Sequence, residues 1–320
     1  MISEDSVSCT PVEPTRVSET SSFCPLQVHL ARISRCFPAD PPGSSLAPHD
    51  SLNELLKLVD EQTRNDVRKF RFLRDARRCL LGRLLVRHIL ASRLSLPWNT
   101  LSFGKDEQGR PFAVCPSFDS PAAPRFDYSV SHDSDLVIVA SLMNKPEQAS
   151  RRIGADVMRI ANPWEECTVA EFVEGIAEQL TPFERRQTLS HVDPSRQLFH
   201  VLALWTLKEA FTKATSEGLR FDLQRLEFDL HYPASSASPS LHIEAVRLDG
   251  KPLKGWEFEL VELKPEVKQE KERYWLAVAV REGGDAVRKE LGGGQEGLEV
   301  TEVGRSDILK TAKGKKAEGD

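Results

Sequence analysis

A carboxylate and an ammonium group stand one helical turn apart in residues 201–219, which read VLALWTLKEAFTKATSEGL. Trp205, Glu209 and Lys213 are four residues apart, so they share one stripe of the predicted helix. Glu209 and Lys213 could hold a metal ion and a phosphate side by side. The alternative is a surface ion pair, which stabilises a helix by about 0.2–0.5 kcal/mol and is the commoner meaning of this spacing alone. Gly218 is expected to end the helix in a left-handed conformation.

Two further polar groups interrupt apolar strands. In residues 126–142, FDYSVSHDSDLVIVASL, alternation predicts a half-buried strand, a tight polar turn at 132–135 and an apolar strand. His132 is therefore expected at a strand end, where a side chain reaches a cleft. In the predicted strand 152–159, Gly154 indicates a close backbone approach, and Asp156 needs a partner such as a metal ion or a cation.

Basic residues are concentrated in one region of a mildly acidic chain. Nine arginines and Lys69 lie between positions 64 and 93, with only Asp66 and Asp75 to balance them. Such a helix is a candidate phosphate-binding surface, and the alternative is a solvated charged face. The turn at 105–110 adds Lys105 and Arg110, which either reach a nucleotide or keep the loop soluble.

The order of the predicted elements places these groups in an α+β protein. A strand at 26–33, a helix and two strands precede residue 150, and a strand, helices and further strands follow it, so two related α/β halves are expected to meet there. Helix starts are predicted by the capping residues Thr168 and Thr181. The strands near 223–232, 241–248, 256–263 and 274–280 are expected to form one antiparallel sheet. Residues 1–24 and 284–320 are predicted to be disordered, flanking halves at 25–150 and 151–283.

Composition excludes several functional classes. The net charge of −5 and the pI of about 6.0 disfavour a nucleic-acid partner. Six scattered cysteines form no zinc-type spacing and fit a reducing compartment. The sequence contains neither an apolar run long enough to span a membrane nor a signal peptide, so we predict a cytoplasmic protein without membrane partners.

Three blocks in fixed order, FDYSVSHDSDLVIVA, IGADVMRI and WTLKEAFTKATSEGL, resemble the signature motifs of the 4′-phosphopantetheinyl transferases of the larger, pseudo-dimeric class. The broad-range eukaryotic type, which includes the human and the fungal α-aminoadipate-reductase-activating enzymes, is the most similar. The resemblance covers about 67–230. It implies two structurally related halves with the active site at their interface, the first binding coenzyme A and the second carrying the metal and the catalytic helix.

The resemblance also implies an activity. Members transfer 4′-phosphopantetheine from coenzyme A to a serine of an acyl or peptidyl carrier protein, release 3′,5′-ADP and need Mg²⁺. Carriers of this family belong to fatty-acid synthase, polyketide or peptide synthetases and the α-aminoadipate reductase of lysine biosynthesis. Because both halves lie within one chain, a monomer is expected. The alternative is a non-catalytic module that binds coenzyme A or a carrier protein.

Residue roles follow from the same resemblance. Asp156 and Glu209 match the metal ligands, and Glu209 or a water near it takes the serine proton. Lys213 matches the lysine that stabilises the phosphate, so these three residues form the implied catalytic set. The nucleotide of coenzyme A is implied to contact Ser129, Ser131, His132, Lys105, Arg110 and Lys213, with its 3′-phosphate on Arg64, Arg68, Arg74 or Arg78.

The chain departs from the pattern of the bacterial members at two positions. Met158 stands where bacterial members have a glutamate, and a thioether is a poor Mg²⁺ ligand. We expect Asp133, or a water that it orients, to fill part of that gap. Ser129 stands where asparagine is typical, so its contact with the nucleotide is expected to pass through water.

Overall fold

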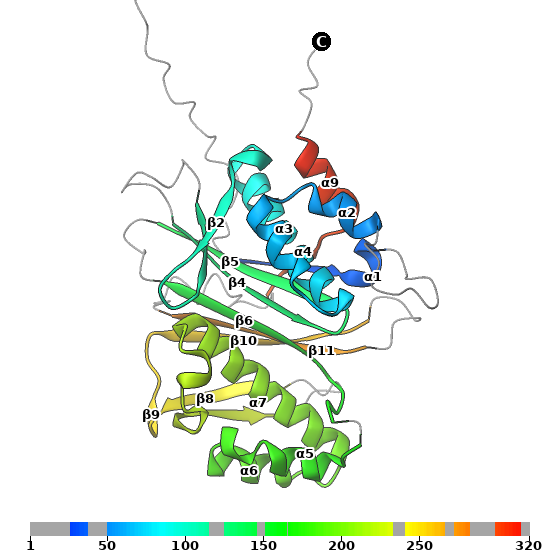
Figure 1. The fold of residues 1–320 in the computed structure, drawn as a ribbon. Coiled ribbons are helices and arrows are strands. Elements are labelled where there is room, and N and C mark those ends of the chain that lie inside the picture. Colours follow the sequence, from blue (N-terminus) through cyan, green and yellow to red (C-terminus); the bar gives the residue numbers. More distant parts are fainter. Residues whose placement is uncertain are drawn as a thin grey trace, which may run out of the picture.

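The computed structural model describes residues 26–37, 50–114, 125–145, 151–164, 166–232, 241–265, 272–281 and 298–314. Two β-sheets stack in the middle of the molecule, and a long helix covers the outer face of each (Figure 1). The layer between the sheets is filled by aliphatic side chains such as Ile138, Leu142, Val157 and Val278, all nearly inaccessible to solvent. The chain is therefore an α+β protein, as the sequence predicted.

The N-terminal half is built on a four-stranded sheet of order β12-β1-β5-β4, in which β12 (Val300–Glu302) is an edge strand. The apolar run at 136–142 forms the buried β5, as expected. Helix α4 packs on the outer face of this sheet, and β2 and β3 form a separate hairpin. The elements are β1 (Leu26–Arg32), α1 (Ile33–Cys36), α2 (Asp50–Leu56), α3 (Glu61–Arg68), α4 (Leu73–Leu94), η1 (Trp98–Thr100), β2 (Ser102–Lys105), β3 (Pro111–Val114), β4 (Arg125–Asp133) and β5 (Leu136–Asn144).

The C-terminal half contains two sheets rather than the single one predicted. Strands β10-β11-β6 form one sheet and β7-β8-β9 the other, and α7 packs between them. Alternation in a strand shows which residues share a face but not which strands pair, so the sequence could not separate the sheets. The elements are β6 (Arg152–Arg159), α5 (Val169–Gly175), η4 (Ala177–Gln179), α6 (Pro182–Leu189), α7 (Pro194–Thr215), η5 (Gly218–Arg220), η6 (Leu223–Arg225), β7 (Leu226–His231), β8 (His242–Leu248), β9 (Lys251–Pro252), β10 (Trp256–Leu263) and β11 (Tyr274–Arg281).

The two halves repeat one topology. In the first, strand β1 is followed by the 22-residue helix α4 and the hairpin β4–β5, whose second strand pairs with β1. In the second, strand β6 is followed by the 22-residue helix α7 and by β10–β11, whose second strand pairs with β6. The strand orders β1-β5-β4 and β6-β11-β10 correspond, which confirms the predicted pair of related halves.

The halves meet where β4 and β6 run side by side. Side chains of β4 accept hydrogen bonds from backbone N–H groups of β6, always 26 residues further along the chain. The free edge of β6 is therefore satisfied by side chains rather than by another strand. The bonds run from Ile153 to Asp127, from Ala155 to Ser129, from Val157 to Ser131 and from Arg159 to Asp133.

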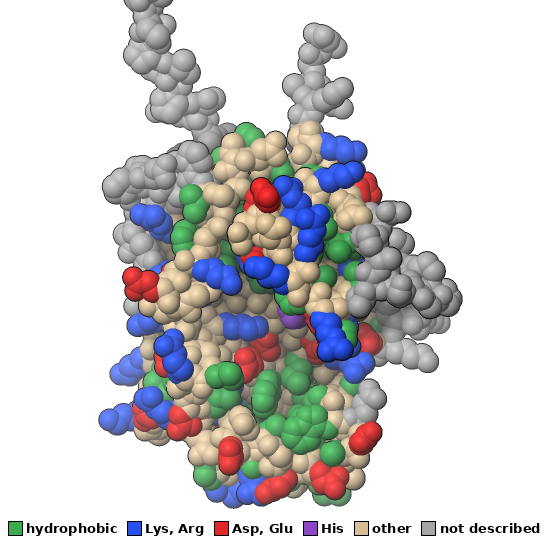
Figure 2. All heavy atoms as spheres, viewed as in Figure 1, with side chains coloured by type: hydrophobic (Ala, Val, Ile, Leu, Met, Phe, Trp, Pro, Cys, Tyr) green, Lys and Arg blue, Asp and Glu red, His purple; other side chains and the backbone are tan. Residues whose placement is uncertain are grey.

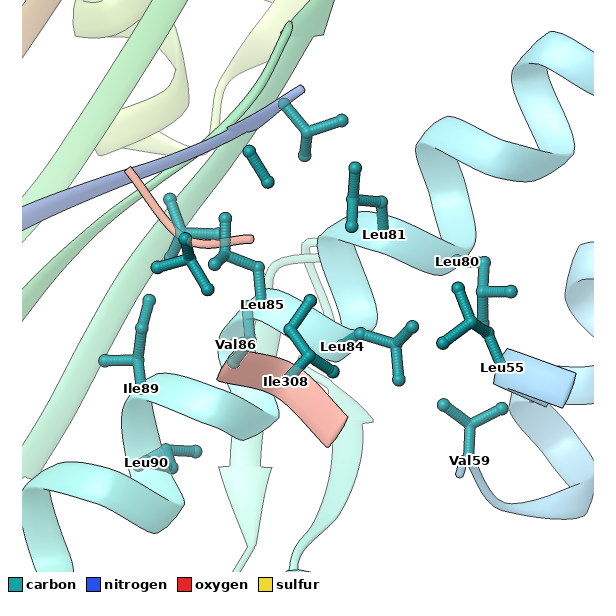
Figure 3. Close-up of a cluster of buried hydrophobic side chains, with 14 of the residues drawn as sticks. Leu55, Val59, Leu80, Leu81, Leu84, Leu85, Val86, Ile89, Leu90 and Ile308 are labelled. Atoms are coloured by element: carbon teal, nitrogen blue, oxygen red, sulfur yellow. The ribbon is translucent and has the colours of Figure 1, made fainter. Parts of the chain in front are cut away.

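The prediction of a disordered C-terminal segment is wrong for residues 298–314. Strand β12 (Val300–Glu302) pairs in parallel with β1, and α9 (Arg305–Lys313) packs on α4. Figure 3 shows Ile308 of α9 among the leucines of α4, and its side chain is 1% exposed. The sequence prediction failed because the apolar residues Val300, Val303 and Ile308 are surrounded by many Gly, Glu and Lys residues, which give the segment a low mean hydropathy. The expected disorder at 1–24 lies outside the described residues.

Helix α7 is longer than predicted at its start and shorter at its end. It begins at Pro194, with Asp193 accepting a hydrogen bond from the backbone of Ser195, and Ser216 ends it in the left-handed conformation expected of Gly218. Gly218 also has a positive φ of 53°, but in the following turn. The predicted capping boxes of Thr168 and Thr181 are confirmed. None of the helices in the described part of the chain combines the length and apolar character needed to cross a membrane.

Candidate active site

Helix α7 brings two of the predicted residues to a third on β6. The Lys213 ammonium lies 2.6 Å from Oδ1 of Asp156, so Asp156 has the cationic partner that the sequence required. Burial, and next the charge of Asp156, raise the pKa of Glu209, while Lys213 acts in the opposite direction. Two carboxylates and an ammonium therefore share one small, partly desolvated region.

Gly154 sets how close α7 approaches β6. A Cβ atom at this position would lie 2.0 Å from the Ala210 carbonyl oxygen and 2.4 Å from the Ala214 nitrogen. The predicted close backbone approach is thereby confirmed. Because alternate residues of a strand share a face, Asp156 points to the same side as Gly154, toward α7.

Asp156 is held from the N-terminal half by Ser131. The Ser131 hydroxyl donates a 2.6 Å hydrogen bond to Oδ1 of Asp156, and only 5% of Ser131 is exposed. Ser129 is 6% exposed, and its hydroxyl accepts from the Ala155 nitrogen at 3.0 Å. Burial and these bonds make both serines part of the junction between the halves, and their expected contact with a nucleotide stays a prediction.

The expected third carboxylate is not in place. Asp133 accepts hydrogen bonds from the backbone of Arg159 at 2.6 Å and from the Ser134 hydroxyl. Within the described residues no three His, Cys, Asp or Glu side chains cluster as metal ligands. Asp133 therefore does not cluster with Asp156 and Glu209 in this geometry, and its expected part in the metal site, directly or through a water, stays a prediction. Met158 instead packs against the apolar cluster around α7.

The remaining donor set still fits Mg²⁺. This ion is usually held by one or two carboxylates, with water and substrate phosphates completing its octahedral shell. Asp156 and Glu209 supply two carboxylates, and their mutual repulsion is one cause of the raised pKa of Glu209. Among the described residues, no hydrogen bond occupies Oδ2 of Asp156 or the carboxylate of Glu209. These are the oxygens that would hold the ion.

His132 lies where predicted, at the exposed end of β4. Its pKa is lowered by partial burial first and then by the charges of Arg78 on α4 and Lys213 on α7. His132 therefore stands between the two long helices, at the junction of the halves. A neutral imidazole with cations on either side is suited to an anionic ligand.

The four candidate arginines for the 3′-phosphate differ in their hydrogen-bond partners and in their exposure to solvent. Arg78 donates through Nε and Nη2 to the Ser134 carbonyl oxygen, at 3.2 and 2.8 Å, and so braces the turn after His132. Arg64 donates to the backbone of Val59. Arg74, whose side chain is 73% exposed, and Arg68 reach solvent.

The two cations of the hairpin loop, Lys105 and Arg110, differ in exposure and in their contacts. Lys105 is exposed at the end of β2. Burial raises the pKa of the Cys79 thiol on α4, and the charge of Lys105 is among the causes that lower it. Arg110 is 8% exposed and forms an ion pair of 2.7 Å with Asp127. It also donates to the carbonyl oxygens of Ile153 and Lys213. Nη1 and Nη2 of Arg110 therefore join the two halves, while Nε bonds Asp127 of its own half, and the expected contact of Arg110 with a nucleotide stays a prediction.

A pocket beside Glu209 escaped the sequence analysis. It has a volume of about 260 Å³, and one wall is formed by residues of α7, including Trp205, Glu209 and Thr212. Its other lining residues include Gly218 of η5, Phe221 between η5 and η6, and Leu223 of η6. The Trp205–Glu209 spacing was a signal for the α7 wall, but no local pattern predicted the other lining residues.

The surface around the site is divided by charge. Figure 2 shows Lys and Arg side chains gathered where α3 and α4 lie, and hydrophobic side chains gathered lower, over the C-terminal half. Acidic side chains lie between these two regions in the same view. An anionic ligand would therefore meet cations mainly from the N-terminal half.

A fold of two related halves, with a carboxylate pair and a lysine at their junction, defines the class of the protein, and the comparisons agree. Residues 47–144 match the family described as 4′-phosphopantetheinyl transferase, N-terminal, and residues 152–279 match the 4′-phosphopantetheinyl transferase superfamily. The chain belongs to this superfamily of enzymes.

Its relatives include the human L-aminoadipate-semialdehyde dehydrogenase-phosphopantetheinyl transferase, 31% identical over 71% of this chain and 68% of that protein. The 4′-phosphopantetheinyl transferase pptA of Paxillus involutus is 30% identical over 68% of this chain and 77% of that protein. An apo-ACPS structure from Chronobacterium ammoiniagenes aligns with 41% of this chain and 97% of its own, at a TM-score of 0.25 and 16% identity, a likeness too weak to support an argument.

Proposed function

We propose that this protein transfers the 4′-phosphopantetheine group of coenzyme A to a serine of an apo carrier protein and releases 3′,5′-ADP. The observation that carries the proposal is the meeting of Glu209, Lys213 and Asp156 where the halves join, beside an arginine-rich helix. Membership of the transferase superfamily supports the same reaction.

In this reaction the serine oxygen attacks the phosphorus that bears the pantetheine group. A new P–O bond forms, the bond from that phosphorus to the bridging pyrophosphate oxygen breaks, and 3′,5′-ADP leaves with the electron pair. Glu209, directly or through one water, takes the serine proton. The support for this role is geometric: Glu209 lines the pocket one helical turn from Lys213. Lys213 faces the phosphates and offsets their charge.

The cation in this proposal is Mg²⁺, which Asp156 and Glu209 would hold. When bound, it supplies positive charge at the reacting phosphates. The protein's own contribution is placement: Ser131 fixes Asp156 from one half, and α7 fixes Glu209 and Lys213 from the other. His132 and exposed arginines of α3 and α4 are proposed to hold the nucleotide.

The partners are proposed to be acyl or peptidyl carrier domains. The printed name of the human relative refers to L-aminoadipate-semialdehyde dehydrogenase, which supports a carrier of the lysine pathway. Carriers of fatty-acid, polyketide or peptide synthesis remain candidates.

The described cysteines Cys36, Cys79 and Cys167 are free thiols, in keeping with a reducing cytoplasm. Both halves lie in one chain, so we propose a monomer.

The test is mass spectrometry of apo carrier domains incubated with this protein, coenzyme A and Mg²⁺. We expect the carrier to gain one phosphopantetheine, and the gain to be lost with EDTA or with Glu209→Ala. Glu217→Ala is the matched control, because Glu217 is exposed just beyond α7 and should leave the reaction intact. If no carrier is modified while coenzyme A still binds by calorimetry, the protein is a binding module instead.

A further inference from the structure

The residue before Glu209 is a lysine that lies inside the protein. The side chain of Lys208 is 1% exposed and that of its partner Glu184, on α6, is 0% exposed, with 2.8 Å between Nζ and Oε2. Lys208 also donates to the carbonyl oxygens of Leu223 and Leu226, at 2.7 and 2.6 Å. The three N–H groups of the ammonium therefore have three acceptors.

Glu184 is equally committed. Its Oε1 accepts from the Phe228 nitrogen at the start of β7, and its Oε2 accepts from the Thr181 nitrogen as well as from Lys208. Burial raises the pKa of Glu184 and lowers that of Lys208, and their attraction opposes both changes. A buried pair of this kind contributes little net stability compared with well-packed apolar residues, so stability alone gives it no clear purpose.

The position of the Lys208–Glu184 pair beside Glu209 indicates a role. Successive residues of an α-helix point about 100° apart, so fixing Lys208 toward α6 also fixes the direction of Glu209. The two carbonyl groups that Lys208 binds belong to Leu223, the first residue of η6, and to Leu226, directly after it, and Leu223 lines the same pocket as Glu209. One ammonium group thus links α7, α6 and the part of the pocket lining that η6 supplies.

We propose that Lys208, through its ion pair with Glu184, is a positioning residue that sets the orientation of Glu209 and the shape of the adjacent pocket. The inference rests on the proposed transferase function and names a residue that acts on the reaction without touching substrate. Loss of the ammonium would let the last turns of α7 rotate and let η6 move away from it. Glu209 would then point less accurately at the serine proton.

The chain offers a matched control in the other half. Arg87 is a buried cation with one carboxylate partner, Asp60, and two backbone carbonyl partners, those of Trp98 and Leu101. Arg87→Met and Lys208→Met therefore each remove a buried cation with one carboxylate and two backbone carbonyl partners, although Asp60 is 40% exposed and Glu184 is not exposed. Only Lys208 lies next to Glu209 and the pocket.

The experiment compares both variants with the wild type in the carrier assay, with rates normalised to coenzyme A binding sites. We expect Lys208→Met to lower kcat by about 10²-fold with KM for coenzyme A almost unchanged, because a small misplacement of a catalytic group costs about this much. Arg87→Met should lower the melting temperature but leave kcat almost unchanged. The proposal is overturned if Lys208→Met keeps wild-type kcat or loses only what Arg87→Met loses.

Two further measurements keep the outcome decisive. If Lys208→Met does not fold, Lys208→Gln, which keeps two donors for the carbonyl groups, replaces it, and wild-type kcat in that variant would again refute the proposal. If the wild type modifies no carrier, the proposed function fails, and positioning is tested by ¹⁹F NMR of Trp205 labelled with fluorotryptophan. The Trp205 signal should then move in the Lys208 variant and not in Arg87→Met; an unmoved signal refutes the inference.

Discussion

The hydroxyl of Ser131 and the carboxylate of Asp156 are 2.6 Å apart, although they belong to different halves of the chain. Ser131 belongs to the series of β4 side chains that accept hydrogen bonds from β6 amides, and it is the member of that series whose hydroxyl also donates to a carboxylate of the candidate active site. The junction of the halves and the placement of Asp156 are therefore the same structural feature.

Ser131→Ala should weaken Mg²⁺ activation by about tenfold or more, because outer partners of metal-binding carboxylates typically contribute this much to affinity. The measurement is the Mg²⁺ concentration that gives half-maximal transfer. Ser129→Ala is the control, since it removes a neighbouring bond of the same series without touching Asp156. Equal effects of both variants would mean that the junction matters and the hydroxyl on Asp156 does not.

Gly154→Ala should destabilise the protein by about 3 kcal/mol and strongly reduce transfer, because the new methyl group would collide with the backbone of α7. Separating α7 from β6 also separates Lys213 from Asp156. Urea unfolding and carrier assays check both effects. In Gly82→Ala the new methyl would meet the side chains of Val130 and Val137, at 3.1 and 3.7 Å, so this control should change both quantities much less.

Arg110→Met should lower the free energy of unfolding by about 3–5 kcal/mol, because it leaves Asp127 as a buried charge without its partner. The double variant Arg110→Met with Asp127→Leu should recover part of this loss. Chemical unfolding measures both. A large loss of coenzyme A affinity with unchanged stability would instead support the nucleotide contact of Arg110 that the sequence predicted.

The ionisation of Glu209 should respond to its two charged neighbours in opposite directions. Asp156→Asn should lower the pKa of Glu209 and Lys213→Met should raise it further. Because the folded state binds this proton more tightly than the unfolded state, the stability from Glu209 is present below its unfolded pKa and is lost as pH rises through its folded pKa. Carboxyl ¹³C titration without metal or coenzyme A checks the shifts; a shift of equal sign in both variants contradicts the arrangement.

Ile308→Ala should destabilise the N-terminal half by about 2–5 kcal/mol, since the side chain is buried among the leucines of α4 (Figure 3). Lys310→Ala, on the exposed side of the same helix, should have little effect. Thermal and urea unfolding compare them. Similar stability of both variants would show that α9 does not contribute to the core in solution.

Some placements in the candidate site could be predicted from local sequence patterns, and others could not. The stripe of Glu209 and Lys213, the close approach at Gly154 and the strand-end position of His132 follow from helix and strand periods, and the structure confirms these placements. Ser129, Ser131, Asp133 and Arg110 were assigned to ligands, and the structure uses them to join the halves. A polar residue at a strand edge has the same sequence pattern whether it faces a ligand or another strand.

By itself, the sequence determined the helices, the strands, the division into two halves and the superfamily, because these depend on periodicity and on motifs within a few residues. Only the tertiary structure decided which strands share a sheet, that residues 300–313 return to the first half, and that Lys208 points inward while Glu209 lines a pocket. Contacts such as Arg110 with Lys213 join residues 103 positions apart. Their partners are chosen by packing and by the need to satisfy buried polar groups, neither of which is written in a local pattern.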